Sequence, residues 1–181
     1  FYGEGESLYT FHMKEYAGVS ETGESQWWMN KEQQKVDANG VGVVDEKGNP
    51  VMETVKVKTS TYDDASYYLC GTALPDMYGG FGTSLSWKGF DLSVDFAYQI
   101  GGQVYDSDYA SLMSNPTSKS KGTNIHADMY GAWVEGSDSN IPRWQFDDSY
   151  SASSSSRFLT DASYLSLQNI NLGYSLPQNV I

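Results

Sequence analysis

Hydrophobic and polar residues alternate without a break over residues 83–100. In the first part, Leu85 and Trp87 share one parity and serines occupy the other. The apolar positions of the second part are Phe90, Leu92, Val94, Phe96, Tyr98 and Ile100. A period of two residues indicates a β-strand with one apolar and one polar face. Lys88 and Gly89 lie between the two parts and predict a tight turn, because glycine adopts a positive φ at low cost.

The same alternation occurs elsewhere along the chain. It predicts strands near residues 7–16 and 164–176, and a shorter strand at 51–59. The polar stretches between them are rich in glycine, serine and aspartate, which favour turns and irregular structure. We therefore expect long loops near residues 17–82 and 101–160.

Three features favour strands that cross a membrane. The predicted strand at 90–100 has the length that a tilted strand needs to span a bilayer, whereas strands of soluble proteins usually have ~5–6 residues. Its polar face carries Asp91 and Asp95, as expected for a wall that faces a water-filled lumen. The turn at 88–89 is minimal while the flanking loops are long, a contrast that is typical of outer-membrane barrels.

The predicted fold class is all-β, as part of a large antiparallel transmembrane β-barrel with long extracellular loops. The predicted membrane strands lie near 7–16, 83–87, 90–100 and 164–176, but a closed barrel needs at least ~8 strands. Residues 1–181 are therefore expected to be an excerpt of a larger barrel. Two alternatives stay open, because alternation alone does not exclude them: a passive porin or adhesin barrel, and a soluble β-sandwich that binds carbohydrate.

Charge and composition narrow the classes of function. The net charge is −12, which argues against nucleic acid as a partner because phosphate binding needs clustered lysine and arginine. Cys70 is the single cysteine, so no disulfide can form within the chain. His12 and His126 lack neighbouring residues at metal-ligand spacing, and no arrangement resembles a catalytic site. We expect no enzyme activity, no metal and no cofactor.

Aromatic residues in the predicted loops are the candidates for contact with a substrate or a partner protein. Flat rings next to polar side chains suit stacking on sugars, although such rings also hold loops together. Arg143 follows a proline and precedes a tryptophan, so it is a candidate for binding a carboxylate or for fixing its own loop. The complete set of candidates is Trp27, Trp28, Tyr105, Trp133, Arg143 and Trp144.

The stretch GTALPDMYGGFGTSLSWKGFDLSVDFAYQIGGQVYD at residues 71–106 resembles the C-terminal barrel region of SusC/RagA-like TonB-dependent outer-membrane transporters of Bacteroidetes. Further matching motifs are YAGV at 16–19, ETGE at 21–24, IPR at 141–143, RFL at 157–159 and DASYLSLQNINLGYSLP at 161–177. Their order and spacing also fit that family, and together they cover nearly the whole chain. Ser166 departs from the pattern, since the family often has arginine there.

The resemblance implies a large barrel in the Gram-negative outer membrane, filled by an N-terminal plug domain that lies outside this sequence. It implies import of glycans, or of peptides in some members, as part of nutrient uptake. The implied partners are a SusD-like surface lipoprotein, the TonB-ExbB-ExbD machinery through the missing N-terminal region, the oligosaccharide or peptide substrate, and outer-membrane lipid.

Overall fold

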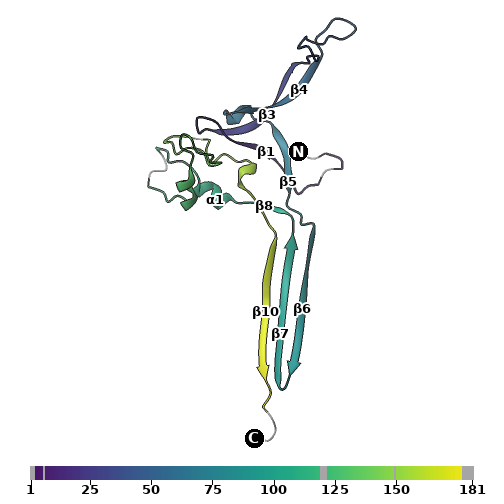
Figure 1. Ribbon diagram of the computed structural model, residues 1–181, viewed down its shortest axis with the longest axis vertical. Helices are drawn as coiled ribbons and strands as arrows, with labels where there is room; N and C mark the ends of the chain where they lie inside the picture. Colours follow the sequence, from purple (N-terminus) through teal and green to yellow (C-terminus); the bar gives the residue numbers. More distant parts are fainter. Residues whose placement is uncertain (1–2, 6, 119–121, 149, 177–181) are drawn as a thin grey trace. The chain divides into compact units, whose positions relative to one another are not determined.

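The computed structural model describes residues 3–5, 7–118, 122–148 and 150–176 (Figure 1). The chain divides into two compact units. The first, here called the strand unit, comprises Phe1–Phe11, Gly71–Tyr105 and Leu159–Ile181. The second, here called the loop unit, comprises His12–Cys70 and Asp106–Phe158. Within the described ranges, no helix is both long enough and apolar enough to cross a membrane.

Three long antiparallel strands dominate the strand unit and lie side by side in Figure 1. They are β6 (Met77–Trp87), β7 (Phe90–Ile100) and β10 (Tyr164–Tyr174), in the order β10-β7-β6. Lys88 and Gly89 join β6 to β7 with φ values of 49° and 88°. Two successive positive φ values make a type I′ turn, whose twist matches that of the flanking strands. The predicted hairpin therefore has the expected turn, and β7 covers the range that the alternation indicates.

One face of this three-stranded sheet, here called the apolar face, is hydrophobic across all three strands. The register places Leu85, Leu92 and Leu172 side by side in one row. Other rows of this face are formed by Phe81, Phe96 and Leu167, by Val94 and Ile170 next to Thr83, and by Trp87, Phe90 and Tyr174. Leu172 is 71% exposed. A hydrophobic face of this extent needs an apolar environment, because a folded soluble protein rarely exposes so large a continuous patch.

The opposite face is polar. Asn169 Nδ2 donates to Asp95 Oδ2 at 3.1 Å, and Ser86 Oγ donates to Asp91 Oδ1 at 2.5 Å. These bonds join the middle strand to both of its neighbours. The expectation of one apolar and one polar face is therefore met across the sheet.

A β-bulge in β10 keeps its apolar residues on the apolar face. Leu167 lies opposite Phe96, but the next paired residue is Asn169, opposite Asp95. Gln168 is the extra residue, and it shifts the parity of the residues that follow it. Leu167 and Ile170 consequently share one face, although residues three positions apart in a regular strand point to opposite faces.

β6 begins at Met77, six positions before the start expected at residue 83, so the expected boundary is wrong. Pro75 and the glycine pair at 79–80 favour irregular structure when the sequence is taken alone. A Cβ at Gly79 would lie 3.1 Å from Tyr98 Oη, which shows that the tyrosine ring covers the glycine backbone. Glycine within a strand often marks such a close approach by a neighbouring side chain.

The expected strand at 7–16 is also divided. β1 (Thr10–Lys14) pairs with β5 (Tyr67–Thr72), whereas β2 (Tyr16–Val19) pairs with β3 (Ser25–Gln34). Glu15 lies where the partner changes, and its carbonyl accepts the Trp28 amide at 3.0 Å. In the described part of the chain, three strands rather than four therefore form the long sheet.

The expected loops contain additional short elements. β4 (Met52–Thr59) extends the β2-β3 sheet and matches the alternation at 51–59. The short helices are η1 (Tyr62–Asp64), α1 (Ser107–Leu112), η2 (Ala127–Gly131) and η3 (Ser156–Phe158). The core of the loop unit is small, and its largest buried apolar side chains are those of Trp27, Met113, Met129 and Phe158.

A two-stranded stem closes the excursion between β7 and β10. It is formed by β8 (Gln103–Tyr105) and β9 (Leu159–Asp161), which pair antiparallel. Beyond the stem, the Asp106 amide donates to the Phe158 carbonyl at 2.9 Å. The segment 106–158 is thus connected to β7 and β10 through two paired strands, β8 and β9.

Candidate functional site

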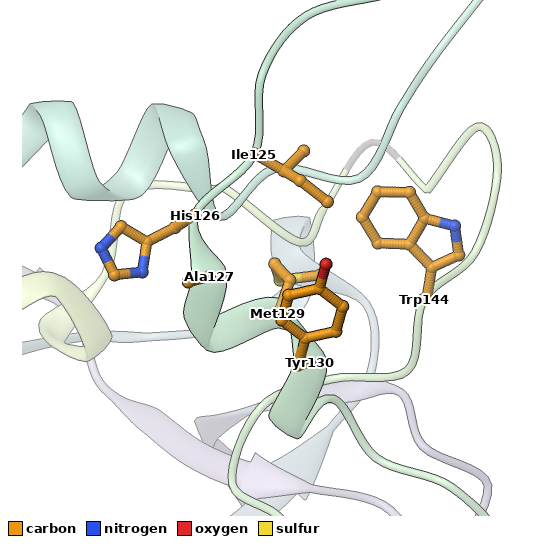
Figure 2. Close-up of a pocket in the computed structure, with 6 residues that line it drawn as sticks. All are labelled: Ile125, His126, Ala127, Met129, Tyr130 and Trp144. Atoms are coloured by element: carbon orange, nitrogen blue, oxygen red, sulfur yellow. The ribbon is translucent and has the colours of Figure 1, made fainter.

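An open cavity of about 450 Å³ lies in the loop unit, here called the aromatic cavity (Figure 2). Its lining residues are Ile125, His126, Ala127, Met129, Tyr130 and Trp144. Tyr130 is 97% exposed and Trp144 is 47% exposed, whereas Met129 is buried. Figure 2 shows His126 pointing away from Trp144. The cavity therefore offers apolar and aromatic surface with few polar groups.

The short helix η2 fixes one wall of this cavity. His126 precedes it and accepts the Asp128 amide through Nδ1 at 3.2 Å, which caps the helix start. Asp128 Oδ2 in turn accepts the Tyr109 hydroxyl at 2.8 Å. Burial raises the pKa of Tyr109, and the hydrogen bond to Asp128 and the negative charge of that residue act in the same direction. The tyrosine therefore stays a neutral donor that ties α1 to η2.

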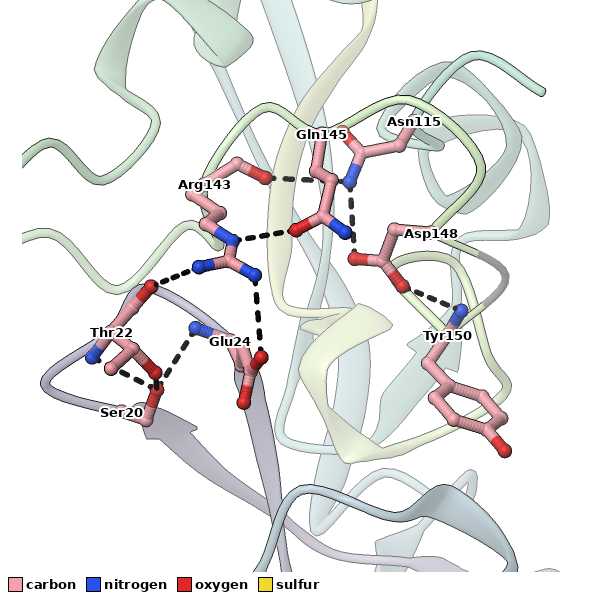
Figure 3. A network of polar contacts seen from close by, with 8 residues as sticks. All are labelled: Ser20, Thr22, Glu24, Asn115, Arg143, Gln145, Asp148 and Tyr150. Carbon is pink, nitrogen blue, oxygen red and sulfur yellow. Dashed lines mark hydrogen bonds and ion pairs between the residues drawn. The ribbon is translucent and has the colours of Figure 1, made fainter.

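Arg143 is the centre of a network that joins distant segments of the loop unit (Figure 3). Its guanidinium donates to the Thr22 carbonyl at 2.8 Å, to Glu24 Oε1 at 3.2 Å and to Gln145 Oε1 at 2.7 Å. Its backbone amide donates to the Gly23 carbonyl at 2.8 Å. The planar guanidinium suits several simultaneous bonds of this kind. Arg143 therefore fixes its own loop against residues 22–24, which was one of the two roles expected for it.

Asn115 extends the network on the other side of Arg143. Its side-chain amide donates to the Arg143 carbonyl at 3.3 Å and to Asp148 Oδ2 at 3.2 Å. Asp148 Oδ1 also accepts the Tyr150 amide at 2.9 Å. Asn115 is almost fully buried, so these bonds hold Arg143 and Asp148 from inside the unit.

Trp27 forms the aromatic core beside this network. Its ring lies edge-on to Tyr16, Tyr62 and Tyr150, with centroid distances of 6.4, 5.3 and 6.2 Å. Burial raises the pKa of Tyr16, while the positive charge of Arg157 partly opposes that rise. Trp27 is only 1% exposed, so the expectation of a loop-surface tryptophan is wrong at this position. The alternating pattern of β3 places it inside, in contact with residues far away in the sequence.

A second cavity of about 310 Å³, here called the polar cavity, lies between the Arg143 network and the Trp27 core. Its lining residues are Glu24, Ser25, Trp27, Ser60, Thr61, Gln145, Asp148 and Tyr150. Hydroxyl, amide and carboxylate groups predominate in this set. Reasoning from sequence did not place Ser60, Thr61 and Asp148 at one site, since no local motif connects residues 60–61 with residue 148.

The three remaining aromatic candidates line neither the aromatic cavity nor the polar cavity. Trp28 is half-buried and has Lys56 Nζ 5.0 Å from its ring centroid, an arrangement that suits a cation–π contact within the β3-β4 ribbon. Trp133 is half-buried and covers Gly23, where a Cβ would collide with its ring. Tyr105 lies in β8 of the strand unit. Of the six candidates, Trp144 alone lines the aromatic cavity and Trp27 alone lines the polar cavity.

No group of three or more histidine, cysteine, aspartate or glutamate residues is arranged to hold a metal ion within the ranges that the structure covers. Burial raises the pKa of the Cys70 thiol, and the nearby negative charge of Glu15 contributes to the rise. A raised pKa disfavours the nucleophilic thiolate.

Comparison with known proteins identifies relatives of the chain, although no family model matches it. The chain is 27% identical over 179 residues to TonB-dependent receptor P3 of Formosa agariphila, an alignment that covers 98% of this chain and 16% of that protein. TonB-dependent receptor P26 of the same organism is 29% identical over 157 residues, or 81% of this chain and 14% of the relative. The resemblance to TonB-dependent receptors is confirmed. The chain thus spans only about one sixth of the length of these receptors.

A solved structure agrees with the sequence comparison. The chain is similar to part of the RagAB peptide importer in the 'open-open' state, with a TM-score of 0.59 and 26% identity over 94% of this chain and 16% of that one. The expected fold class and outer-membrane location of a TonB-dependent receptor are borne out by these relatives. The relatives are receptors and an importer rather than enzymes, which fits the expectation of a non-enzymatic protein.

Proposed function

We propose that the chain is a segment of a TonB-dependent outer-membrane transporter, and that it supplies neighbouring wall strands and extracellular loops. The exposed apolar face of β6, β7 and β10 carries this proposal. Each of these strands has 11 residues, which fits the thickness of a bilayer for a tilted strand. The polar face with Asp91 and Asp95 suits the inside of a barrel.

The whole transporter would import oligosaccharides or peptides together with a SusD-like surface lipoprotein. The similarity to the RagAB peptide importer supports a peptide or a related oligomer as substrate and a second protein as partner. The loop unit would contribute to capture, because the aromatic cavity presents Tyr130 and Trp144 to solvent. Exposed aromatic rings of this kind are common anchors for ligands and partner proteins.

The test measures uptake in cells that carry the full-length receptor. Cells that lack the receptor are expected to lose uptake of a labelled glycan or peptide, and so are cells with an inactive TonB. If uptake requires the receptor but persists without TonB, the receptor is a passive porin and the proposal is wrong.

A second comparison tests the loop unit. Replacement of Tyr130 and Trp144 by alanine is expected to reduce uptake about 5- to 150-fold at normal receptor abundance, since each of the two aromatic contacts contributes ~0.5–1.5 kcal/mol. Phe146→Ala is the matched control, because Phe146 is an exposed aromatic residue nearby that does not line the aromatic cavity. Equal effects of both replacements would contradict a role of the aromatic cavity in capture.

A further inference from the structure

The apolar face of the strand unit contains an open groove of about 570 Å³, here called the wall groove. Its apolar lining residues are Met77 and Phe81 of β6, Tyr98 and Ile100 of β7, and Leu165 of β10. They come from the ends of the three strands that lie opposite the turn at 88–89 (Figure 1). Short turns of outer-membrane barrels face the periplasm, so the wall groove belongs to the outer half of the membrane.

A missing side chain explains why the groove forms at this place. Gly79 lies between Met77 and Phe81 on the same face of β6, because alternate residues of a strand share a face. The Tyr98 ring covers this glycine, since a Cβ there would lie 3.3 Å from Tyr98 Cζ. Phe81 in turn stacks on Phe96 at a centroid distance of 5.1 Å and lies 6.3 Å from the Tyr98 centroid. These ring contacts give the groove a preformed aromatic wall.

Two polar side chains that line the groove already have hydrogen-bond partners. Gln99 Nε2 donates to the carbonyls of Gly101 and Ala162 at 3.4 and 3.2 Å. Ser163 Oγ accepts the Gly101 amide at 2.9 Å. Tyrosine, the remaining polar residue type at the groove, is enriched at the boundary between lipid and water. The groove therefore suits an occupant that binds through packing, and not a sugar or peptide whose polar groups need partners.

We propose that the wall groove binds one acyl chain of an outer-leaflet lipid. The outer membrane supplies such chains at the apolar face, and a flexible chain restores the dispersion contacts that an empty groove lacks. A second copy of the wall would instead bring a regular row of side chains, which fits a groove at one end of the sheet less well. The inference rests on the proposed wall function of β6, β7 and β10. It goes beyond general contact with lipid because it assigns one chain a fixed place.

The test uses the full-length receptor in vesicles of phosphatidylethanolamine and phosphatidylglycerol. A trace of phosphatidylcholine carries a photoreactive diazirine in the middle of one acyl chain, and mass spectrometry after irradiation locates the labelled residues. Label is expected to concentrate on Met77 and Phe81. Leu85 is the internal comparison, because it lies on the same face of β6 outside the groove. The same lipid with the diazirine in its headgroup is expected to leave the groove unlabelled.

Leu165→Trp enlarges a lining side chain and fills the groove, so it is expected to lower the label on Phe81 about 5- to 10-fold. Leu172→Trp is the matched control and is expected to leave that label unchanged. Leu172 is an exposed leucine on the same strand and face, and it does not line the groove. Heat-modifiable electrophoresis checks that both variants fold.

Uniform label along the apolar face, equal effects of the two variants, or headgroup label in the groove would overturn the inference while the face still meets lipid. Cross-linked receptor dimers with an unlabelled groove would assign the groove to a second copy and overturn it as well. If the whole apolar face stays unlabelled, the proposed wall function fails together with the inference. The two failures can therefore be told apart.

Discussion

Val94 offers the sharpest test of the apolar face. It lies in β7 between Thr83 of β6 and Ile170 of β10, four residues from Phe90 and six from Ile100. At about 3.3 Å per residue, these intervals correspond to ~13 and ~20 Å along the strand. A strand tilt of ~40° reduces them to ~10 and ~15 Å along the membrane normal, which together match an apolar band of ~25 Å. Val94 is therefore placed near the middle of the bilayer.

Val94→Lys is expected to destabilise the full-length receptor by ~2–4 kcal/mol, the cost of a lysine near the bilayer midplane on a lipid-facing strand. Tyr174→Lys, opposite Phe90 at the end of the sheet, is expected to cost only ~0–1 kcal/mol for its charge. Ser93→Lys is the matched control, since Ser93 is the adjacent residue on the polar face. Urea titration of the receptor in phospholipid vesicles, followed by heat-modifiable electrophoresis, measures the folded fraction.

The reasoning is refuted if the cost of a lysine does not depend on the face of β7 that carries it. If Val94→Lys and Ser93→Lys shift the urea midpoint equally, the two faces of β7 do not differ in environment. The apolar face would then be covered by protein rather than lipid, and the barrel interpretation of the strand unit would fail.

Three further predictions concern the loop unit. Arg143→Gln is expected to reduce local stability by ~1–3 kcal/mol because it removes the charged bond to Glu24, and hydrogen exchange of residues 20–26 measures this. Gly23→Ala is expected to increase proteolysis of the same segment, since Gly23 has a φ of 84° and a Cβ would collide with the Trp133 ring. The Asn49 amide is the main cause of a lowered pKa at Asp45, so the turn at 45–49 should be fully stabilised above pH ~4 and loosen as pH falls through the lowered value. Hydrogen exchange corrected for intrinsic rates measures that loss, and an unchanged turn at pH 2 would contradict it.

The strand unit was largely predictable from sequence, because its organisation depends on local periodicity. Alternation identified β7 with its full length, and Lys88 and Gly89 predicted the tight turn at 88–89. The start of β6 was missed because glycine normally weakens a strand, and only the Tyr98 ring from the neighbouring strand compensates at Gly79. The bulge at Gln168 likewise depends on the pairing with β7.

The loop unit was much less predictable, because its contacts join residues that are far apart in sequence. Trp27 resembled an exposed loop residue, yet Tyr62 and Tyr150 enclose it from two other segments. The role of Arg143 depended on which carboxylate lay within reach, and that carboxylate belongs to Glu24, 119 residues earlier in the chain. Such pairings require the tertiary structure, since no local pattern encodes them.

The stem formed by β8 and β9 has a consequence for how receptors of this kind diversify. The register between β7 and β10 is determined on the strand side of the stem, and the closure cost of a flexible loop rises only slowly with its length. Residues 106–158 can therefore be exchanged or changed in length together with residues 12–70, their partners in the loop unit, while the neighbouring strands keep their pairing. Recombination at the stem would give a cell new surface loops on an unchanged barrel wall, and the same junction offers an engineer a site for grafting loops between receptors.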